Sequence, residues 1–136
     1  MALEWTPALS TGVLELDHQH RKLFEFINEL KASLADPKKA ADAQTMIRAV
    51  KFIREYTEIH FITEEACMAR YMCPVAKVNE QAHARFLKAA RKFETGLAAL
   101  EDPAAHLAEF EEFLGAWWTN HICAIDVHLK GVAPSA

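Results

Sequence analysis

Apolar side chains recur at alternating three- and four-residue intervals along four stretches of the chain. This spacing is typical of helices that bury one face against neighbouring helices. The pattern predicts helices over residues 17–35, 38–72, 75–99 and 103–130, preceded by an extended lead-in over residues 1–16. Because the connections are short, consecutive helices should run antiparallel. The predicted fold is all-α, an up-down-up-down antiparallel four-helix bundle.

Prolines mark the breaks between these stretches. Pro37 and Pro103 each follow an aspartate, an arrangement that places an N-cap residue before a proline at the first helical position. Cys73 precedes Pro74, and the residue before a proline is disfavoured in the α conformation. The whole chain holds only four glycines and five prolines, these three included, which supports the all-α prediction.

Polar and titratable side chains interrupt the apolar stripes at six positions. They are His20, His60, Glu64, Asn79, His83 and His121. In an antiparallel bundle all six fall at one end, because the starts of the first and third helices meet the ends of the second and fourth. Burying an unpaired carboxylate such as Glu64 costs several kcal/mol, and no Lys or Arg lies on the stripes near this level. A bound metal is therefore indicated, since imidazoles and carboxylates hold paired iron or manganese ions in bundle cores.

Size and charge narrow the classes of protein to consider. The chain has 136 residues, of which 51% are hydrophobic and 25% charged, as expected for a single domain over residues 1–136. The formal charge of −4 gives no basic field that would attract nucleic acid or a membrane surface. No apolar run approaches the roughly 20 residues of a membrane helix, and no signal peptide is visible. A cytoplasmic protein is expected.

The cysteines indicate no disulfide framework. Cys67, Cys73 and Cys123 are an odd number without CxxC spacing, so neither a set of disulfides nor a zinc clip is favoured. All three are expected to be reduced thiols in or near the core. Cys67 and Cys123 should lie toward the end of the bundle that holds the histidines, as inert thiols.

Three motifs, in order along nearly the whole chain, resemble the hemerythrin family and in particular its bacterial hemerythrin-like domains. The first is the run DHQH at residues 17–20, preceded by Trp5 and Gly12. The second is HFITEE at residues 60–65, followed by Met68 and Tyr71, which resembles HFxxEE. The third is WWTNHI at residues 117–122 with Asp126 beyond it, which resembles WxxxHI and a terminal bridging aspartate.

The resemblance implies a non-haem centre of two iron ions, bridged by carboxylates and by an oxo or hydroxo group, with O2 as a ligand at an open position. It assigns His20 and His60 to one iron, His83 and His121 to the other, and Glu64 and Asp126 to both. His60 and Glu64 are four residues apart and so share a helix face. Asp126 lies off the ideal stripe, and its inclusion depends on the resemblance.

One family ligand is replaced in this chain. The family has HxxxH at the start of the third helix, whereas here Asn79 stands four residues before His83. The first-ranked alternatives are that the Asn79 amide oxygen binds the metal or that a water fills the position. The second is that Glu80, which forms a Glu-x-x-His pair with His83, reaches the metal. A mononuclear site that has lost the metal beside His83 is a further alternative.

Several other polar residues are given structural roles. His18, His106 and His128 are expected at the surface or beside the ligands. Asp17 is expected to cap a helix, with a hydrogen bond to His20 as the alternative. Glu65 is expected to face solvent.

Three apolar residues close to the ligands in sequence are candidates for an O2 pocket: Phe61, Met68 and Trp117. Aromatic and Met side chains at helical spacing are usually core residues, and these three are expected to serve as both core and pocket wall.

The expected function is that of a diiron O2-binding protein in oxygen storage, delivery or sensing, without enzymatic activity. A sensing role would require a partner protein. Because Asn79 leaves the second iron more open or richer in oxygen ligands, one alternative is a redox enzyme that activates O2 or peroxide. Another is a metal-binding bundle with a degenerate site.

Overall fold

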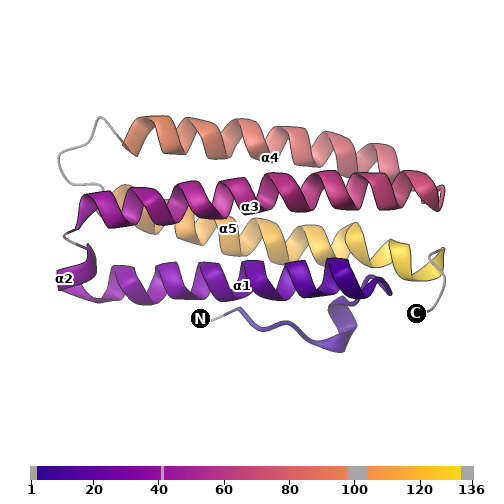
Figure 1. Cartoon of the computed structure of the whole chain (residues 1–136), viewed down its shortest axis with the longest axis horizontal. Helices are drawn as coiled ribbons and strands as arrows, with labels where there is room; N and C mark the ends of the chain where they lie inside the picture. Colours follow the sequence, from indigo (N-terminus) through magenta and orange to yellow (C-terminus); the bar gives the residue numbers. More distant parts are fainter. Residues whose placement is uncertain (1–2, 41, 98–103, 133–136) are drawn as a thin grey trace.

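Four long helices lie side by side in the structure, a computed structural model that describes residues 3–40, 42–97 and 104–132 (Figure 1). They are α1 (Leu14–Ala35), α3 (Ala43–Arg70), α4 (Ala76–Leu97) and α5 (Ala104–Ala124). The short elements are η1 (Pro7–Leu9), α2 (Pro37–Ala40) and η2 (Asp126–Gly131). No β-strand occurs in these residues, so the all-α prediction is confirmed.

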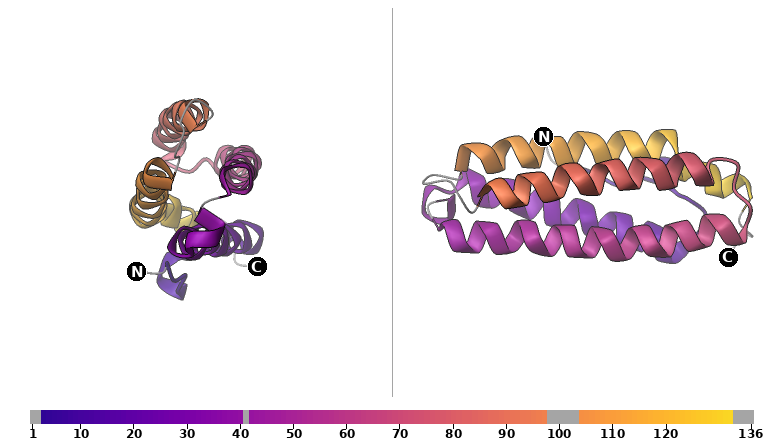
Figure 2. Two further views of the ribbon diagram at one scale, coloured as in Figure 1. Left: turned by 90° about the vertical axis from the view of Figure 1, so that its left-hand side faces the viewer. Right: turned by 90° about the horizontal axis from the view of Figure 1, so that it is seen from above.

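The four long helices form a closed ring around one core (Figure 2). α1 packs against α3 and α5, and α4 packs against the same two helices. Consecutive helices run in opposite directions, which confirms the up-down-up-down bundle (Figure 1). The first turns of α1 and α4 therefore meet the last turns of α3 and α5 at the end where α3 is joined to α4, which is called the histidine end below.

The buried stripes follow the predicted spacing with one shift on α5. On α3 the predicted three- and four-residue spacing holds, since the buried residues include Met46, Val50, Ile53, Thr57, His60 and Glu64. On α5 the sequence pattern favoured Trp117, but Trp118 is fully buried and Trp117 only partly so.

None of the helices in the described residues is long and apolar enough to cross a membrane.

The second predicted helix is divided into α2 and α3. Pro37 begins α2 as expected, but α2 ends at Ala40 and a new helix begins at Ala43. Asp42 causes the second start, because its side chain accepts hydrogen bonds from the backbone N–H of Thr45 at 3.2 Å and from its hydroxyl at 2.8 Å. Residues 98–103, which include Pro103, lie outside the described residues.

The two ends of the described chain also differ from the prediction. The lead-in is not extended throughout, because it contains η1 and α1 already begins at Leu14. α5 ends at Ala124 rather than near residue 130, and the chain continues as the 3-10 helix η2. The N-terminal segment runs along α1, where the Leu3 N–H donates to Asn28 Oδ1 and the Asn28 amide donates to the Leu3 carbonyl, both at 2.8 Å.

The three cysteines are unpaired. Cys73 is buried and Cys67 is partly buried, and both belong to a small apolar cluster at the histidine end. Cys123 is exposed, so the expectation that all three lie in or near the core is wrong for this residue. It falls on the outer face of the last turn of α5.

Candidate metal centre

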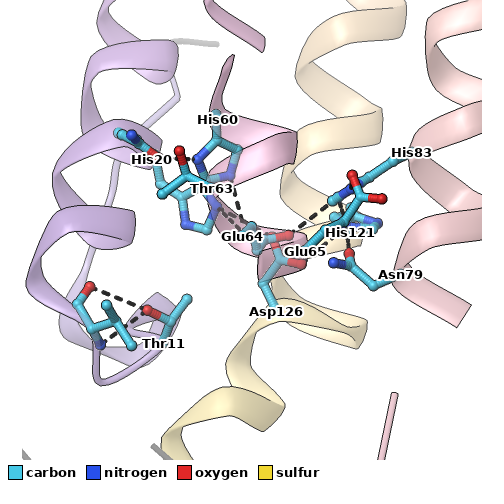
Figure 3. Close-up of polar contacts among 12 residues, drawn as sticks. Thr11, His20, His60, Thr63, Glu64, Glu65, Asn79, His83, His121 and Asp126 are labelled. Atoms are coloured by element: carbon cyan, nitrogen blue, oxygen red, sulfur yellow. Dashed lines mark hydrogen bonds and ion pairs between the residues drawn. The ribbon is translucent and has the colours of Figure 1, made fainter. Parts of the chain in front are cut away.

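Seven polar side chains from all four long helices and from η2 converge at the histidine end (Figure 3). They are His20 on α1, His60 and Glu64 on α3, Asn79 and His83 on α4, His121 on α5 and Asp126 at the start of η2. None is more than 5% exposed. The structure therefore brings together every residue that the sequence placed in the metal site.

A first group of possible metal ligands consists of His20, His60, Glu64 and Asp126, whose ligand atoms all lie within 4.8 Å of one another. Glu64 Oε2 is 3.3 Å from His20 Nε2 and 3.1 Å from His60 Nε2. Asp126 Oδ2 is 3.2 Å from His20 Nε2. These separations are those of donor atoms around one cation at metal–ligand distances near 2.1 Å.

A second group consists of Glu64, His83, His121 and Asp126, again within 4.8 Å of one another. Glu64 Oε1 is 3.1 Å from His83 Nε2, and Asp126 Oδ1 is 3.0 Å from His121 Nε2. The two imidazole Nε2 atoms are 3.1 Å apart. Glu64 and Asp126 thus belong to both groups.

Each shared carboxylate presents a different oxygen to each group. Glu64 directs Oε2 at the histidines of α1 and α3 and Oε1 at His83. Asp126 directs Oδ2 at His20 and Oδ1 at His121. This arrangement can bridge two cations, as carboxylates do in metal sites within helical bundles.

The hydrogen-bonding state of these atoms fits two cations. Both oxygens of Glu64, both oxygens of Asp126 and the Nε2 atoms of His20 and His60 are shut off from water without a hydrogen-bond partner among the described residues. Polar atoms left in this state are costly, and buried charges are paired or coordinate metals. Metal ions between the carboxylates and imidazoles would satisfy them.

The site is strongly coupled electrostatically. Burial opposes ionisation of Glu64, but the surrounding imidazoles of His60, His20 and His83 outweigh it and hold the pKa of Glu64 well below its usual range. Burial likewise lowers the pKa of His20, but the adjacent carboxylates of Asp126 and Glu64 outweigh it and raise this pKa to about 9. Burial lowers the pKa of His60. The metal-free centre therefore holds a proton on His20 that a metal must displace.

Asp126 reaches the centre because α5 ends before it. A residue five positions beyond His121 would point about 140° away from it on a continuous α-helix. After Ala124 the chain leaves the α conformation at Ile125, with φ −122° and ψ −61°, and tightens into η2. This change turns the fully buried Asp126 side chain toward the ligands.

Asn79, not Glu80, faces the second group. The Asn79 side chain is fully buried and its Oδ1 is 2.7 Å from His121 Nε2 (Figure 3). Glu80 is exposed on the outer face of α4. The Glu80 carboxylate therefore points away from the centre.

Two residues contact the outward Nδ1 atoms of ligand histidines, and the sequence predicted neither contact. Gln19 Oε1 lies 2.5 Å from His60 Nδ1, and Glu65 Oε2 lies 3.3 Å from His83 Nδ1. The prediction that Glu65 faces solvent holds in part, since its side chain is 34% exposed but also contacts His83. Each residue is adjacent in sequence to a ligand, and histidines that bind metals usually donate their other ring N–H to such a group.

Aromatic rings surround the histidines. Phe61 stacks on His83 with ring centroids 3.6 Å apart, and Trp117 stacks on His121 at 4.3 Å. Trp118, which the prediction omitted, lies 5.8 Å from His20 and 5.5 Å from His60. These rings exclude water from the ligands.

Met68 lies in a separate apolar cluster at the histidine end. It is fully buried there with Leu16, Cys73 and Leu129. The cluster closes the core beyond the metal ligands.

The remaining histidines belong to neither group of possible metal ligands. His18 and His128 are exposed, as expected for surface residues. His106 is partly buried in the first turn of α5, far from the histidine end, with its ring 4.9 Å from that of Phe93.

Asp17 has neither of the roles expected for it. It is buried and accepts hydrogen bonds from the backbone N–H and hydroxyl of Thr11, both at 2.8 Å, and from the Ser10 hydroxyl at 2.6 Å. The N-cap position of α1 is Val13. Asp17 therefore fastens the N-terminal segment to α1.

Comparisons with known proteins agree with this geometry. Residues 11–133 match the family described as the hemerythrin HHE cation binding domain. The chain is 28% identical over 120 residues to a bacteriohemerythrin of Stenotrophomonas maltophilia (strain R551-3), covering 88% of this chain and 74% of that protein. It is 29% identical over 128 residues to a hemerythrin-like protein of Naegleria gruberi, covering 94% and 91%.

Solved structures support the fold. A crystal structure of a hemerythrin point mutant superposes with a TM-score of 0.82 at 20% sequence identity, covering 97% of this chain and 98% of that one. Together with the family match over residues 11–133, this fold and the paired ligand groups lead to one conclusion. The chain belongs to the hemerythrin family of non-haem diiron, O2-binding domains.

Proposed function

We propose that this chain binds O2 reversibly at a diiron centre with a variant ligand set, in oxygen storage, delivery or sensing. The proposal rests on the two shared carboxylates. Glu64 and Asp126 each direct one oxygen at each pair of histidines. Two metal ions held side by side are the arrangement that uses all four oxygens. Bound iron would supply an open coordination position for O2.

The proposed ligand sets follow the two groups of contacts. His20, His60, Glu64 Oε2 and Asp126 Oδ2 hold the first iron, which leaves it with four protein donors. His83, His121, Glu64 Oε1 and Asp126 Oδ1 hold the second iron. The amide oxygen of Asn79 could add a fifth protein donor to the second iron, so we place the open position on the first.

Asn79 completes the second set. Its Oδ1 lies on the same side as His121 Nε2, at 2.7 Å, so the amide oxygen can bind the second iron or hydrogen-bond to a water that does. An amide oxygen is a harder and weaker ligand than imidazole. The exposed Glu80 is the less favoured alternative.

The apolar surroundings suit a small uncharged ligand. We assign the walls of the O2 pocket to Phe61 and Trp117, which stack on ligands. We add Met68, which lies in the apolar cluster at the histidine end. Trp118 joins them beside His20 and His60. Such walls limit the access of water and protons to the centre.

A second candidate function is a redox enzyme that acts on O2 or peroxide. Glu65 favours it, because this partly exposed carboxylate beside His83 can pass protons between solvent and the site. A diiron centre with an oxygen-rich ligand set is also suited to such chemistry. The two functions differ in whether O2 leaves unchanged.

An optical spectrum of the iron-loaded protein tests both functions. The anaerobically reduced protein is measured before O2 is added, after it is added, and after it is removed again. A charge-transfer band that appears and then disappears supports reversible binding. A band that decays to a ferric spectrum with peroxide consumed or released supports the enzyme, and the absence of any iron-dependent band contradicts a diiron function.

A further inference from the structure

The two metal positions differ in what stands behind their histidines. The outward nitrogen of His60 faces the neutral amide of Gln19, with Nδ1 and Oε1 2.5 Å apart. The outward nitrogen of His83 faces the carboxylate of Glu65, with Nδ1 and Oε2 3.3 Å apart (Figure 3). One position therefore has a negative charge behind it that the other lacks.

The His83 ring is held in the orientation that this contact requires. Phe61 stacks on the face of the His83 ring with an interplanar angle of 6°, and His83 Nε2 lies 3.1 Å from Glu64 Oε1. When Nε2 binds a metal, the ring proton resides on Nδ1. That N–H then donates to Glu65, which is the acceptor within reach.

Glu65 and Asn79 act on the same metal position in opposite senses. A histidine that donates its ring N–H to a carboxylate is a stronger electron donor to its metal. Asn79 offers an amide oxygen where the family pattern has an imidazole, which makes the donor set of this position weaker. Gln19 lies behind the other position, beside His60, where no expected histidine is replaced.

We propose that Glu65 is a positioning residue that acts through His83 to compensate the second metal position for Asn79. The inference rests on the proposed function, because it requires that the centre hold two metal ions. According to this inference, the difference between the neutral Gln19 and the charged Glu65 brings the metal affinities of the two positions closer together. Without the Glu65 charge, the position beside Asn79 becomes the one that loses its metal first.

Titration of the metal-free protein with Co(II), followed by visible absorption and calorimetry, tests this inference without O2. The wild-type protein should bind two equivalents. Glu65→Gln keeps a hydrogen-bond acceptor for His83 but removes the charge, and should weaken one of the two positions by about tenfold, as loss of such an outer partner typically does. Gln19→Glu is the matched control, and should leave that position unchanged while strengthening the other.

A second pair of variants identifies the position that is affected. Asn79→His restores an imidazole, so adding Glu65→Gln to it should cost less than Glu65→Gln costs alone. A further variant, Glu65→Leu, should weaken the position at least as much as Glu65→Gln.

The outcomes separate the inference from the proposed function. Wild-type affinity in Glu65→Gln together with a loss only in Glu65→Leu means that Glu65 merely orients the ring, and this overturns the inference. An equal loss at both positions, or the same cost with Asn79 and with His at residue 79, also overturns it. A wild-type protein that binds fewer than two Co(II) ions contradicts the proposed diiron function itself.

Discussion

Asn79 stands where the hemerythrin resemblance led us to expect a histidine, and it lies among the candidate ligands. Its side chain is fully buried, its Oδ1 contacts His121, and its Nδ2 has no hydrogen-bond partner among the described residues. A buried amide in this state is costly unless a ligand or water uses it. The residue is therefore placed to change how the second iron behaves.

Restoring the family ligand should prolong the oxygenated state. In Asn79→His a third imidazole joins His83 and His121, which makes the second iron less open and less oxygen-rich. We expect autoxidation to slow, measured as the lifetime of the oxygenated absorption spectrum in air. A lifetime equal to that of the wild-type protein would contradict this role for Asn79.

Asp17 should matter for stability, because it accepts three hydrogen bonds within a buried site. Asp17→Ala leaves the Thr11 donors unpaired and should lower the free energy of unfolding by about 1.5–3 kcal/mol, the usual range for hydrogen bonds to a charged group. Urea denaturation measures the change. Glu15→Ala, at an exposed position in the same turn, is the control and should stay within about 0.5 kcal/mol of wild type.

Among the elements, η2 decides whether the centre is complete. It carries Asp126 and begins where α5 ends, so its placement determines whether the Asp126 carboxylate reaches the other candidate ligands. The N-terminal segment fixes η2 from outside. Gly12, with φ +80°, brings its backbone against Lys130, where a Cβ would lie 3.3 Å from the Lys130 Cα.

Gly12→Ala should therefore disturb both stability and metal binding. The left-handed conformation costs a residue with a Cβ about 1–2 kcal/mol, and the new atom presses on η2. We expect a lower free energy of unfolding in urea and weaker binding of Co(II). Gly131→Ala is the matched control, since a Cβ there meets nothing within 4 Å, and metal binding that is equally weakened in both variants would contradict this explanation.

For the whole molecule, the metal-free and metal-loaded forms should respond to pH in opposite directions. The adjacent carboxylates of Asp126 and Glu64 outweigh the effect of burial and raise the pKa of His20 from 6.5 to about 9. Without metal, the stability that protonated His20 contributes is fully present below pH 6.5 and is lost as the pH rises through 9. With metal, the same proton must leave, so affinity increases over this range.

Thermal unfolding of both forms between pH 6 and pH 9.5 measures this difference. The midpoint of the metal-free protein should fall across the range, whereas the stabilisation by bound metal should grow. His20→Gln removes the titrating group and should flatten the metal-free profile. A metal-free midpoint that rises between pH 7 and pH 9 would contradict the raised pKa of His20.

Much of the site could be predicted from the sequence, because helical spacing is local information. A residue four positions from another shares its face, so His60 and Glu64 on α3 had to point the same way. Polar residues in otherwise apolar stripes indicated a common ligand, and the antiparallel order of the helices placed them at one end. The all-α fold and the convergence of His20, His60, His83 and His121 followed from these rules alone.

What only the tertiary structure decided depends on where helices end and on what packs beside them. The turn after Ala124 that directs Asp126 inward is not visible in a periodic pattern, and neither is the start of α3 at Asp42. Gln19 and Glu65 contact histidines of other helices, so no spacing along the chain predicts them. Contacts between helices depend on the rotation and depth of each helix in the bundle, which side-chain packing fixes only when all four have come together.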